Sequence, residues 1–156
     1  MSSSDKVCDT GNSRASESRL IDIQVHGVLA PDPRLRVALT NQSDEKLLIF
    51  EHSLPWRGAY SMIILAVETD PAGTPLKRTL PIDDPGPGTT TIEPGETVSS
   101  EIALAPRFPD LPRILADKDV LVFWAYRFQQ VGEPPLPWAA GHVILPRATS
   151  GGRPGD

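Results

Sequence analysis

Apolar and polar residues alternate in several short segments of this chain, which is typical of β-strands with one buried face. The clearest case is 97–104, where one side of an extended chain carries Val98, Ser100, Ile102 and Leu104 and the other carries Thr97, Ser99, Glu101 and Ala103. Pro94 and Gly95, just before it, predict a tight turn, because proline fixes φ at the first central position and glycine accepts a positive φ at the second. The pattern therefore predicts a strand that begins at a Pro-Gly turn.

Eight other segments give strand signals separated by turn residues. They are residues 21–26, 34–39, 47–50, 60–67, 76–80, 89–92, 120–128 and 142–145. Because 60–67 is almost wholly apolar, we expect a central strand covered on both faces, whereas the short, charged 76–80 is expected at an edge. A helix-like pattern extends for only one turn or so, at 112–117. Strand centres recur about every 10–16 residues, which favours an all-β, antiparallel sandwich of about 7–9 strands.

Composition divides the 156 residues into one domain and two polar ends. Residues 1–19 are rich in Ser, with Asp and Asn among the other polar residues, and 148–156 are rich in Gly, with Arg and Pro. Both ends are therefore expected to be disordered, with the sandwich domain at 20–147. Segment 1–19 lacks the apolar stretch of a secretory signal, and its Cys8 is the only cysteine. We accordingly expect no disulfide within the chain and a cytoplasmic location.

The net charge of -5 comes from interspersed acidic and basic residues. A protein that binds nucleic acid normally has a basic stripe, and one that binds a membrane surface has a polybasic patch, so neither partner is expected. No apolar run approaches the ~18 residues of a membrane-spanning helix. With nucleic acids and membranes not expected, the partners that remain are small molecules and other proteins.

The residues that could carry catalysis do not form a recognised motif. The histidines, His26, His52 and His142, lack the close spacing of metal ligands. The Asp83-Asp84 pair precedes Pro85 and is read as the start of a turn. No serine or cysteine lies in a nucleophile motif. We therefore predict a non-enzyme with no catalytic residue, metal or cofactor. An active site would have to combine His52 with Asp83 or Asp84 across strands.

The aromatic residues fall into two groups. Trp124, Tyr126 and Phe128 share one face of segment 120–128, which predicts core packing, while Phe123 lies on the other face. The other group consists of tryptophans that follow prolines in predicted loops, namely Trp56 after Pro55 and Trp138 after Pro137. A loop tryptophan either covers an open end of a sandwich or contacts a partner. Pro55, Trp56, Pro137 and Trp138 are therefore the candidate partner-binding residues, in loops that the prolines would stiffen.

A longer pattern resembles a known family. It consists of Leu-Arg-Val-Ala-Leu-Thr-Asn at 35–41, Ser-Asp-Glu at 43–45, Leu54-Pro55, Gly73, Leu76, Arg78, Pro81 and Ile-Glu-Pro-Gly-Glu at 92–96. This order resembles the Ig-like N-terminal, propeptide-type domain of deuterolysin-like zinc metallopeptidases. It is similar, more loosely, to intracellular proteinase inhibitors of the BsuPI type. The resemblance covers 35–104, and the region after Ala105 departs from both families.

The resemblance implies an Ig-like sandwich that binds another protein, for which a peptidase is one candidate. It implies no peptidase activity, because the catalytic domain is missing. We therefore expect a non-catalytic protein-interaction module, inhibitor-like or accessory, that binds through loops at the sandwich end. Two alternatives stay open beside it. The first is a sandwich that binds a small molecule or carbohydrate, and the second is a structural subunit paired through the sheet edge near 76–80. The sequence leaves the oligomeric state open.

Overall fold

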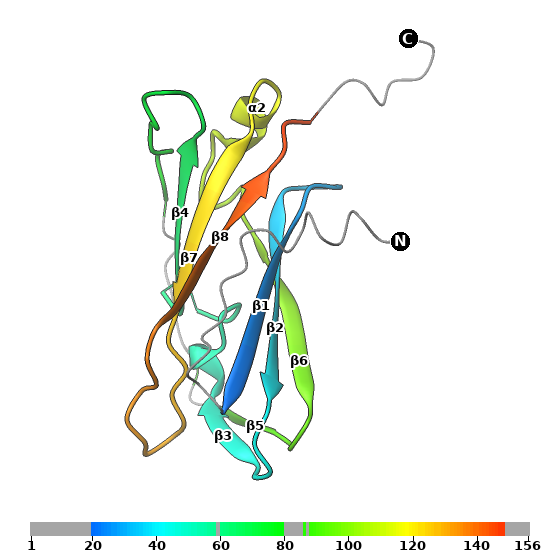
Figure 1. Ribbon diagram of the computed structural model, residues 1–156, viewed down its shortest axis with the longest axis vertical. Helices are drawn as coiled ribbons and strands as arrows, with labels where there is room; N and C mark the ends of the chain where they lie inside the picture. The colour runs from blue at the N-terminus through cyan, green and yellow to red at the C-terminus, as the bar shows by residue number, and fades with distance from the viewer. Residues whose placement is uncertain (1–19, 59, 80–85, 87, 149–156) are drawn as a thin grey trace.

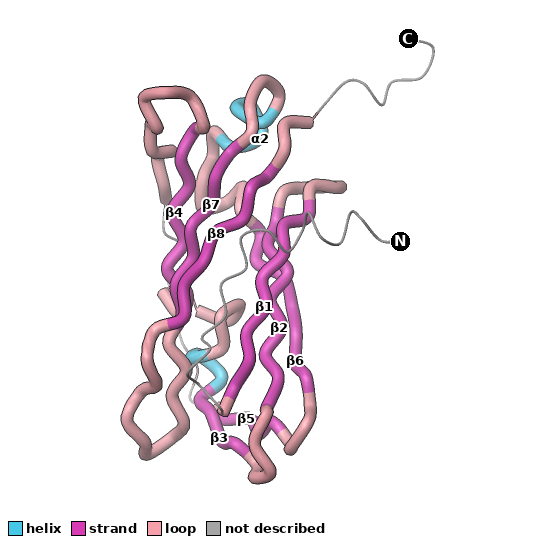
Figure 2. Tube along the Cα trace, viewed as in Figure 1, coloured by secondary structure: helices cyan, strands magenta, loops and turns pink. Residues whose placement is uncertain are grey.

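The computed structural model describes residues 20–58, 60–79, 86 and 88–148, and within them strands are the main secondary structure, joined by turns and loops (Figures 1 and 2). The elements in chain order are β1 (Ile21–Val28), β2 (Arg34–Asn41), β3 (Leu47–Phe50), the 3₁₀-helix η1 (Glu51–Ser53), β4 (Met62–Glu68), β5 (Thr89–Ile92), β6 (Thr97–Ala103), the helix α2 (Leu111–Leu115), β7 (Val120–Tyr126) and β8 (Ala139–Leu145). The prediction of an all-β chain is confirmed. The disorder expected of 1–19 and of 148–156 concerns, apart from Ala148, residues outside the described ranges.

The strands form three antiparallel sheets, in the orders β1-β2-β6, β3-β5 and β4-β7-β8. The two three-stranded sheets run along the long axis of the molecule, and the β3-β5 pair lies at one end (Figure 1). Inward side chains of both large sheets form one core, in which Val25, Val37 and Val122 have no exposed surface. The predicted core face of the aromatic strand is confirmed, since Trp124, Tyr126 and Phe128 are each 2% exposed.

The Pro-Gly turn lies between β5 and β6 and joins two different sheets. Gly95 has φ 76, which only glycine adopts without strain, and the amide of Glu96 donates to the carbonyl of Glu93 over 2.9 Å. The strand expected at 97–104 begins directly after this turn, as β6. The turn therefore moves the chain from the small sheet, where β5 pairs with β3, to the large sheet, where β6 pairs with β2.

Asn41, at the end of β2, ties this turn to the rest of the fold. Its side chain is fully buried, and its amide nitrogen donates to the carbonyls of Glu45 (2.7 Å) and Ile92 (2.9 Å). Its side-chain oxygen accepts from the amide of Ser43 (2.9 Å), and its own carbonyl accepts from the amide of Gly95 (2.9 Å). One buried amide thus holds the 41–45 turn and the Pro-Gly turn against each other.

The structure corrects two strand predictions. Segment 60–67 was expected to be central and covered on both faces, but β4 is an edge strand, and its Ile63 and Leu65 side chains face solvent. An unbroken apolar run is typical of a buried strand, yet it also fits a strand whose outer face is apolar and exposed. Segment 76–79 forms no strand; an isolated bridge joins Pro75 to Val67, and the amide of Leu76 donates to Ala66.

Several boundaries also differ slightly from prediction, among them the start of β4 at Met62 rather than at 60 and the end of β7 at Tyr126 rather than at 128. The expected helical turn at 112–117 is present as α2, which starts one residue earlier and buries Leu111, Ile114 and Leu115. The last strand, β8, begins at Ala139 rather than at 142. Its first three residues, Ala-Ala-Gly, have low intrinsic β-propensity, so pairing with β7 decides their conformation rather than the residues themselves.

Candidate functional site

The outer face of the β4-β7-β8 sheet is exposed and apolar. Because side chains alternate along a strand, every second residue of these three strands points away from the core. Those residues are Ile63, Leu65 and Val67 in β4, Leu121, Phe123 and Ala125 in β7, and Ala140, His142 and Ile144 in β8. We call these nine residues the apolar sheet face. His142 is its one polar side chain.

Strand pairing arranges the apolar sheet face in three rows. Ile63, Ala125 and Ala140 form the first row, Leu65, Phe123 and His142 the middle row, and Val67, Leu121 and Ile144 the third. The large side chains stay open to solvent: Ile63 is 46% exposed, Leu65 45%, Phe123 42% and Ile144 47%. In the middle row the rings of Phe123 and His142 lie 6.3 Å apart, centroid to centroid. The face is therefore a contiguous apolar surface across three strands.

The opposite outer face, on the β1-β2-β6 sheet, has the usual polar composition. Glu101 on β6 lies between two arginines of β2, with its carboxylate 2.7 Å from Arg34 Nε and 2.9 Å from Arg36 Nη2. The hydroxyl groups of Thr40 and Thr97 lie 2.7 Å apart across the same strand pair. The same fold therefore covers one sheet with charges and hydrogen bonds and leaves the other apolar.

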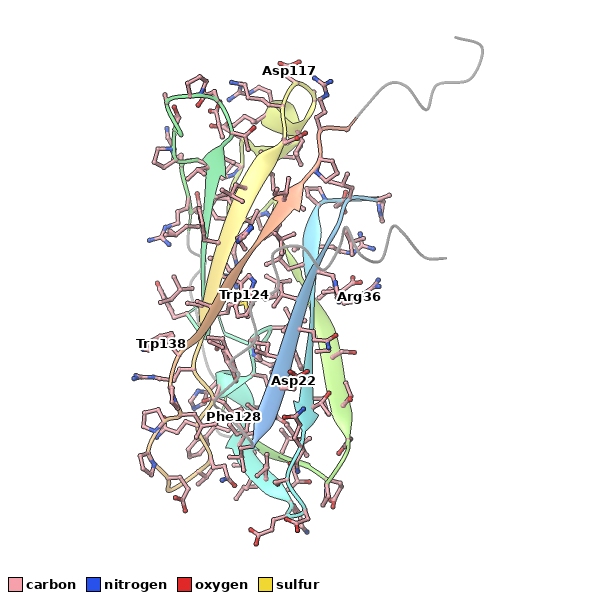
Figure 3. All side chains as sticks on the ribbon, in the orientation of Figure 1. Asp22, Arg36, Asp117, Trp124, Phe128 and Trp138 are labelled. Atoms are coloured by element: carbon pink, nitrogen blue, oxygen red, sulfur yellow. The ribbon has the colours of Figure 1, made fainter. Side chains whose placement is uncertain are left out.

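Trp138 extends the apolar sheet face beyond its first row. It immediately precedes β8, is 50% exposed and lies on the side of the molecule opposite Arg36 (Figure 3). The guanidinium carbon of Arg127, just after β7, lies 4.7 Å from the centroid of the Trp138 ring. A cation over an aromatic face is attractive, so this contact favours one orientation of an exposed indole. Trp138 and Arg127 thus form the end of the apolar surface.

The four residues predicted to bind a partner differ in exposure. Trp138 and Pro137 are exposed, whereas Pro55 is buried and Trp56 is partly buried against the core. The two loops lie at the same end of the sheet, because the hydroxyl of Tyr126 donates to the carbonyl of Ser53 over 2.7 Å and Tyr126 pairs with Ala139. Burial raises the pKa of Tyr126 well above its ordinary value, so this hydroxyl remains protonated and keeps the bond.

The residues considered for catalysis are separated or lie outside the described ranges. His52 in η1 stacks on Phe50, with ring centroids 5.2 Å apart. Its proposed partners, Asp83 and Asp84, fall outside the described residues. His26 lies in β1 and His142 in β8. Among the described residues, no three His, Cys, Asp or Glu side chains lie close enough together to hold a metal ion.

A pocket of about 290 Å³ lies beside the edge of β4. Its lining is mainly apolar and aromatic, with two arginines: Tyr60, Met62, Ile63, Ile64, Arg78, Arg107 and Phe108. Arg78 Nη1 lies 3.5 Å from the carbonyl of Ile64, and the buried Arg107 has interactions of its own. The pocket therefore offers no convergent set of unengaged polar groups that would define a ligand.

Comparison with known proteins adds no identification: no protein-family model matches the chain, and no curated protein matches it significantly. Within the described ranges, no helix has both the length and the apolar character needed to cross a membrane. The candidate site therefore rests on the geometry of the molecule.

Sequence reasoning did not identify the apolar sheet face as a surface. The signal was available in part, because Phe123 falls on the face of β7 opposite to Trp124, and 62–67 is apolar at both odd and even positions. What the sequence does not give is the strand order. Only the order β4-β7-β8, with no layer over its outer side among the described residues, shows that these positions are exposed together.

Proposed function

We propose that this chain is a non-catalytic protein-interaction module built on an Ig-like sandwich, and that its binding surface is the apolar sheet face together with Trp138. The observation that carries the proposal is the difference between the two outer faces. One sheet is covered by the Arg34–Glu101–Arg36 ion pairs, and the other exposes Phe123 and its apolar neighbours.

The size of the apolar sheet face supports a binding role. Three strands spaced about 4.8 Å apart, each seven residues long at about 3.4 Å per residue, cover about 14 Å by 24 Å. An area of about 340 Å² is within the range of the largest apolar patches on soluble monomers, about 300–600 Å², which are often functional. Single exposed apolar residues are common on proteins, but a three-strand array of them is not.

The loop before β8 favours one specific form of this function, which is inhibition of a peptidase. Residues 133–138 carry Pro134, Pro135 and Pro137, and all of the segment except Leu136 is exposed. A stiff, exposed loop loses little conformational entropy on binding, which suits insertion into an active-site cleft. The test is titration of the purified chain against endopeptidases of each catalytic class, and equimolar loss of activity that Trp138→Ala abolishes is the supporting result.

The surface itself is tested by site-specific photocrosslinking in cells that produce the protein. A benzophenone amino acid replaces Phe123 in one variant and Ser99, on the polar outer face of β6, in a matched control. Because the benzophenone side chain is aromatic, it preserves the character of position 123. We expect protein adducts at 123 and none at 99. Absence of any adduct at 123, or equal adducts at both positions, would rule out this binding surface.

A further inference from the structure

We propose that a second copy of this chain occupies the apolar sheet face. The two copies dock face to face about a twofold axis that runs across the strands at Phe123, so that the strands of one copy run opposite to those of the other. This inference rests on the proposed function, since it names the partner of the same surface. In such a dimer each strand lies opposite its own copy. The middle row meets the middle row, and the first row of one copy meets the third row of the other.

The rows are complementary in size under this rotation. Ala125 and Leu121 lie equally far from Phe123 along β7, and Ala140 and Ile144 lie equally far from His142 along β8. Along β7 and β8 the twofold axis therefore places the small side chains of one copy against the large side chains of the other, whereas along β4 Ile63 of one copy meets Val67 of the other. Facing sheets are usually rotated by about 30°. That rotation moves the contacts of the first and third rows sideways, toward the adjacent strand of the other copy. The first row still faces the third row.

The charges at the two ends are complementary as well. Arg127 and Asp119 also lie equally far from Phe123, at opposite ends of β7, and the structure records no ion pair for either within the described ranges. Asp119 accepts the backbone amide of Arg147 over 2.8 Å, which fixes the position of its carboxylate. The twofold axis brings the Arg127 end of each copy to the Asp119 end of the other, so this contact occurs twice in the dimer. Parallel docking would instead place like charges together, which costs binding energy.

The end at Asp119 is acidic beyond that one residue. Glu68 and Asp70 share a single cation, Lys118, whose ammonium group lies 2.7 Å and 3.5 Å from their carboxylates. Asp117, in the turn before β7, adds a further carboxylate at the same end (Figure 3). An approaching arginine therefore meets a surplus of negative charge, which favours the reversed orientation.

The polar ends of the given sequence are poor alternatives as a cover for this face. Residues 1–19 and 149–156 contain no aromatic residue, no leucine and no isoleucine. A segment of that composition cannot bury enough apolar surface to offset the entropy lost when it becomes ordered. An apolar surface is a better cover than either polar end, and the apolar sheet face of a second copy is such a surface.

The area sets the expected affinity. Two copies bury about 700 Å² of sheet surface, and the rim residues Trp138, Arg127, Asp119 and Pro146 bring the total toward the ~1,000 Å² of a small specific interface. We therefore expect a reversible dimer with a dissociation constant in the micromolar range, on the order of 1–100 μM.

The first test is sedimentation equilibrium of the full chain across that concentration range. We expect a monomer–dimer equilibrium. Phe123→Glu places two carboxylates against each other at the axis and should weaken association roughly 100-fold or more. The matched control, Ser99→Glu on the polar face, should leave it unchanged. Circular dichroism and thermal melting check that both variants fold. A wild-type chain that stays monomeric throughout, or a dimer that Phe123→Glu does not weaken, would overturn the proposal.

The second test reads the orientation by crosslinking with a short bismaleimide in a Cys8→Ser background. A mixture of Leu121→Cys and Ala125→Cys chains should crosslink, because these positions face each other, and Ala125→Cys alone should not. The reverse result would overturn the antiparallel arrangement.

The photocrosslinking experiment separates this proposal from the proposed function. An adduct at position 123 with the mass of two chains supports both, whereas an adduct with a different protein keeps the interaction module and overturns the self-association.

Discussion

Arg127 and Trp138 make a cation–π contact at the edge of the apolar sheet face, with 4.7 Å between the guanidinium carbon and the ring centroid. At an exposed site such a contact is worth about 0.5–1 kcal/mol. That is enough to favour one orientation of the indole and too little to matter for folding. Trp138 is therefore an ordered, exposed side chain, whereas Trp56 is partly buried against the core.

The two tryptophans should accordingly respond differently to truncation. Trp138→Ala is expected to change the free energy of unfolding by less than about 1 kcal/mol, because it removes only an exposed contact. Trp56→Ala should cost about 2 kcal/mol, because it removes buried surface and leaves a gap at the core. Urea unfolding of both variants measures the difference. Equal destabilisation by the two changes would contradict these assignments.

Gly27, in β1, packs closely against side chains of β8. A Cβ atom at position 27 would lie 2.7 Å from Leu145 Cδ2 and 2.8 Å from Val143 Cγ1, which is too close for unstrained packing. Gly27→Ala should therefore destabilise the protein by about 1–3 kcal/mol. The measurement is the shift of the urea unfolding midpoint.

Two further variants show whether this loss comes from the contact between the sheets. Gly86→Ala, at a position with no atom within 4 Å of an added Cβ, should have little effect. The double change Gly27→Ala with Val143→Ala should be more stable than the sum of the single effects predicts, because the smaller side chain makes room. Strict additivity would show that the close approach is not the cause.

Asn41 gives the largest expected effect of a polar substitution. Asn41→Ala leaves the buried carbonyl of Ile92 and the amide of Ser43 without their partner, and we expect a loss of about 3 kcal/mol. Gln42→Ala next to it removes an exposed side chain and should be nearly neutral. Chemical denaturation of both variants tests the assignment. A small effect at Asn41 would show that the two turns do not depend on its side chain.

Glu101 should make stability depend on pH. The hydrogen bond from Arg36, followed by that from Arg34, lowers the pKa of this carboxyl in the folded state. Its contribution is therefore complete above the pKa of an unfolded glutamate, about 4.3, and is lost as pH falls through the lower folded-state pKa.

Glu101→Gln should accordingly be less stable than the wild type near neutral pH, and the difference should close in acid. Thermal unfolding midpoints across an acid titration give the measurement. Glu45→Gln, at an exposed carboxylate without an ion pair among the described residues, serves as the control and should show no such convergence. A gap between Glu101→Gln and the wild type that stays constant with pH would exclude the ion pairs as its source.

The sequence was most informative where local chemistry decides the conformation. The Pro-Gly turn, the alternation in 98–104 and the inward aromatic side chains of β7 follow from proline and glycine backbone preferences and from the period of two in a strand. The first residues of β8, from Ala139, were not predicted as a strand. Their own β-propensity is low, and pairing with β7 makes them extended.

The candidate site was less predictable, because it depends on strand order. The apolar run in β4 reads as a strand buried on both faces, and only the finding that β4 is an edge strand with an open outer face reverses the interpretation of Ile63 and Leu65. The proline-rich pattern singled out Trp138 as a candidate contact residue, and the structure places its side chain in an exposed position. Its position beside Arg127, which is eleven residues away in the chain, required the three-dimensional structure.

The path of β8 has a practical consequence for experiments that attach a label or a fusion partner. β8 belongs to the β4-β7-β8 sheet, and after Leu145 the chain is held near α2 by the amide of Ala148, which donates to the carbonyl of Leu115 over 2.7 Å. β1 belongs to the other sheet. A bulky group joined after Ala148 would therefore be attached to the sheet that carries the apolar sheet face, whereas one joined before Leu20 would be attached to the other sheet.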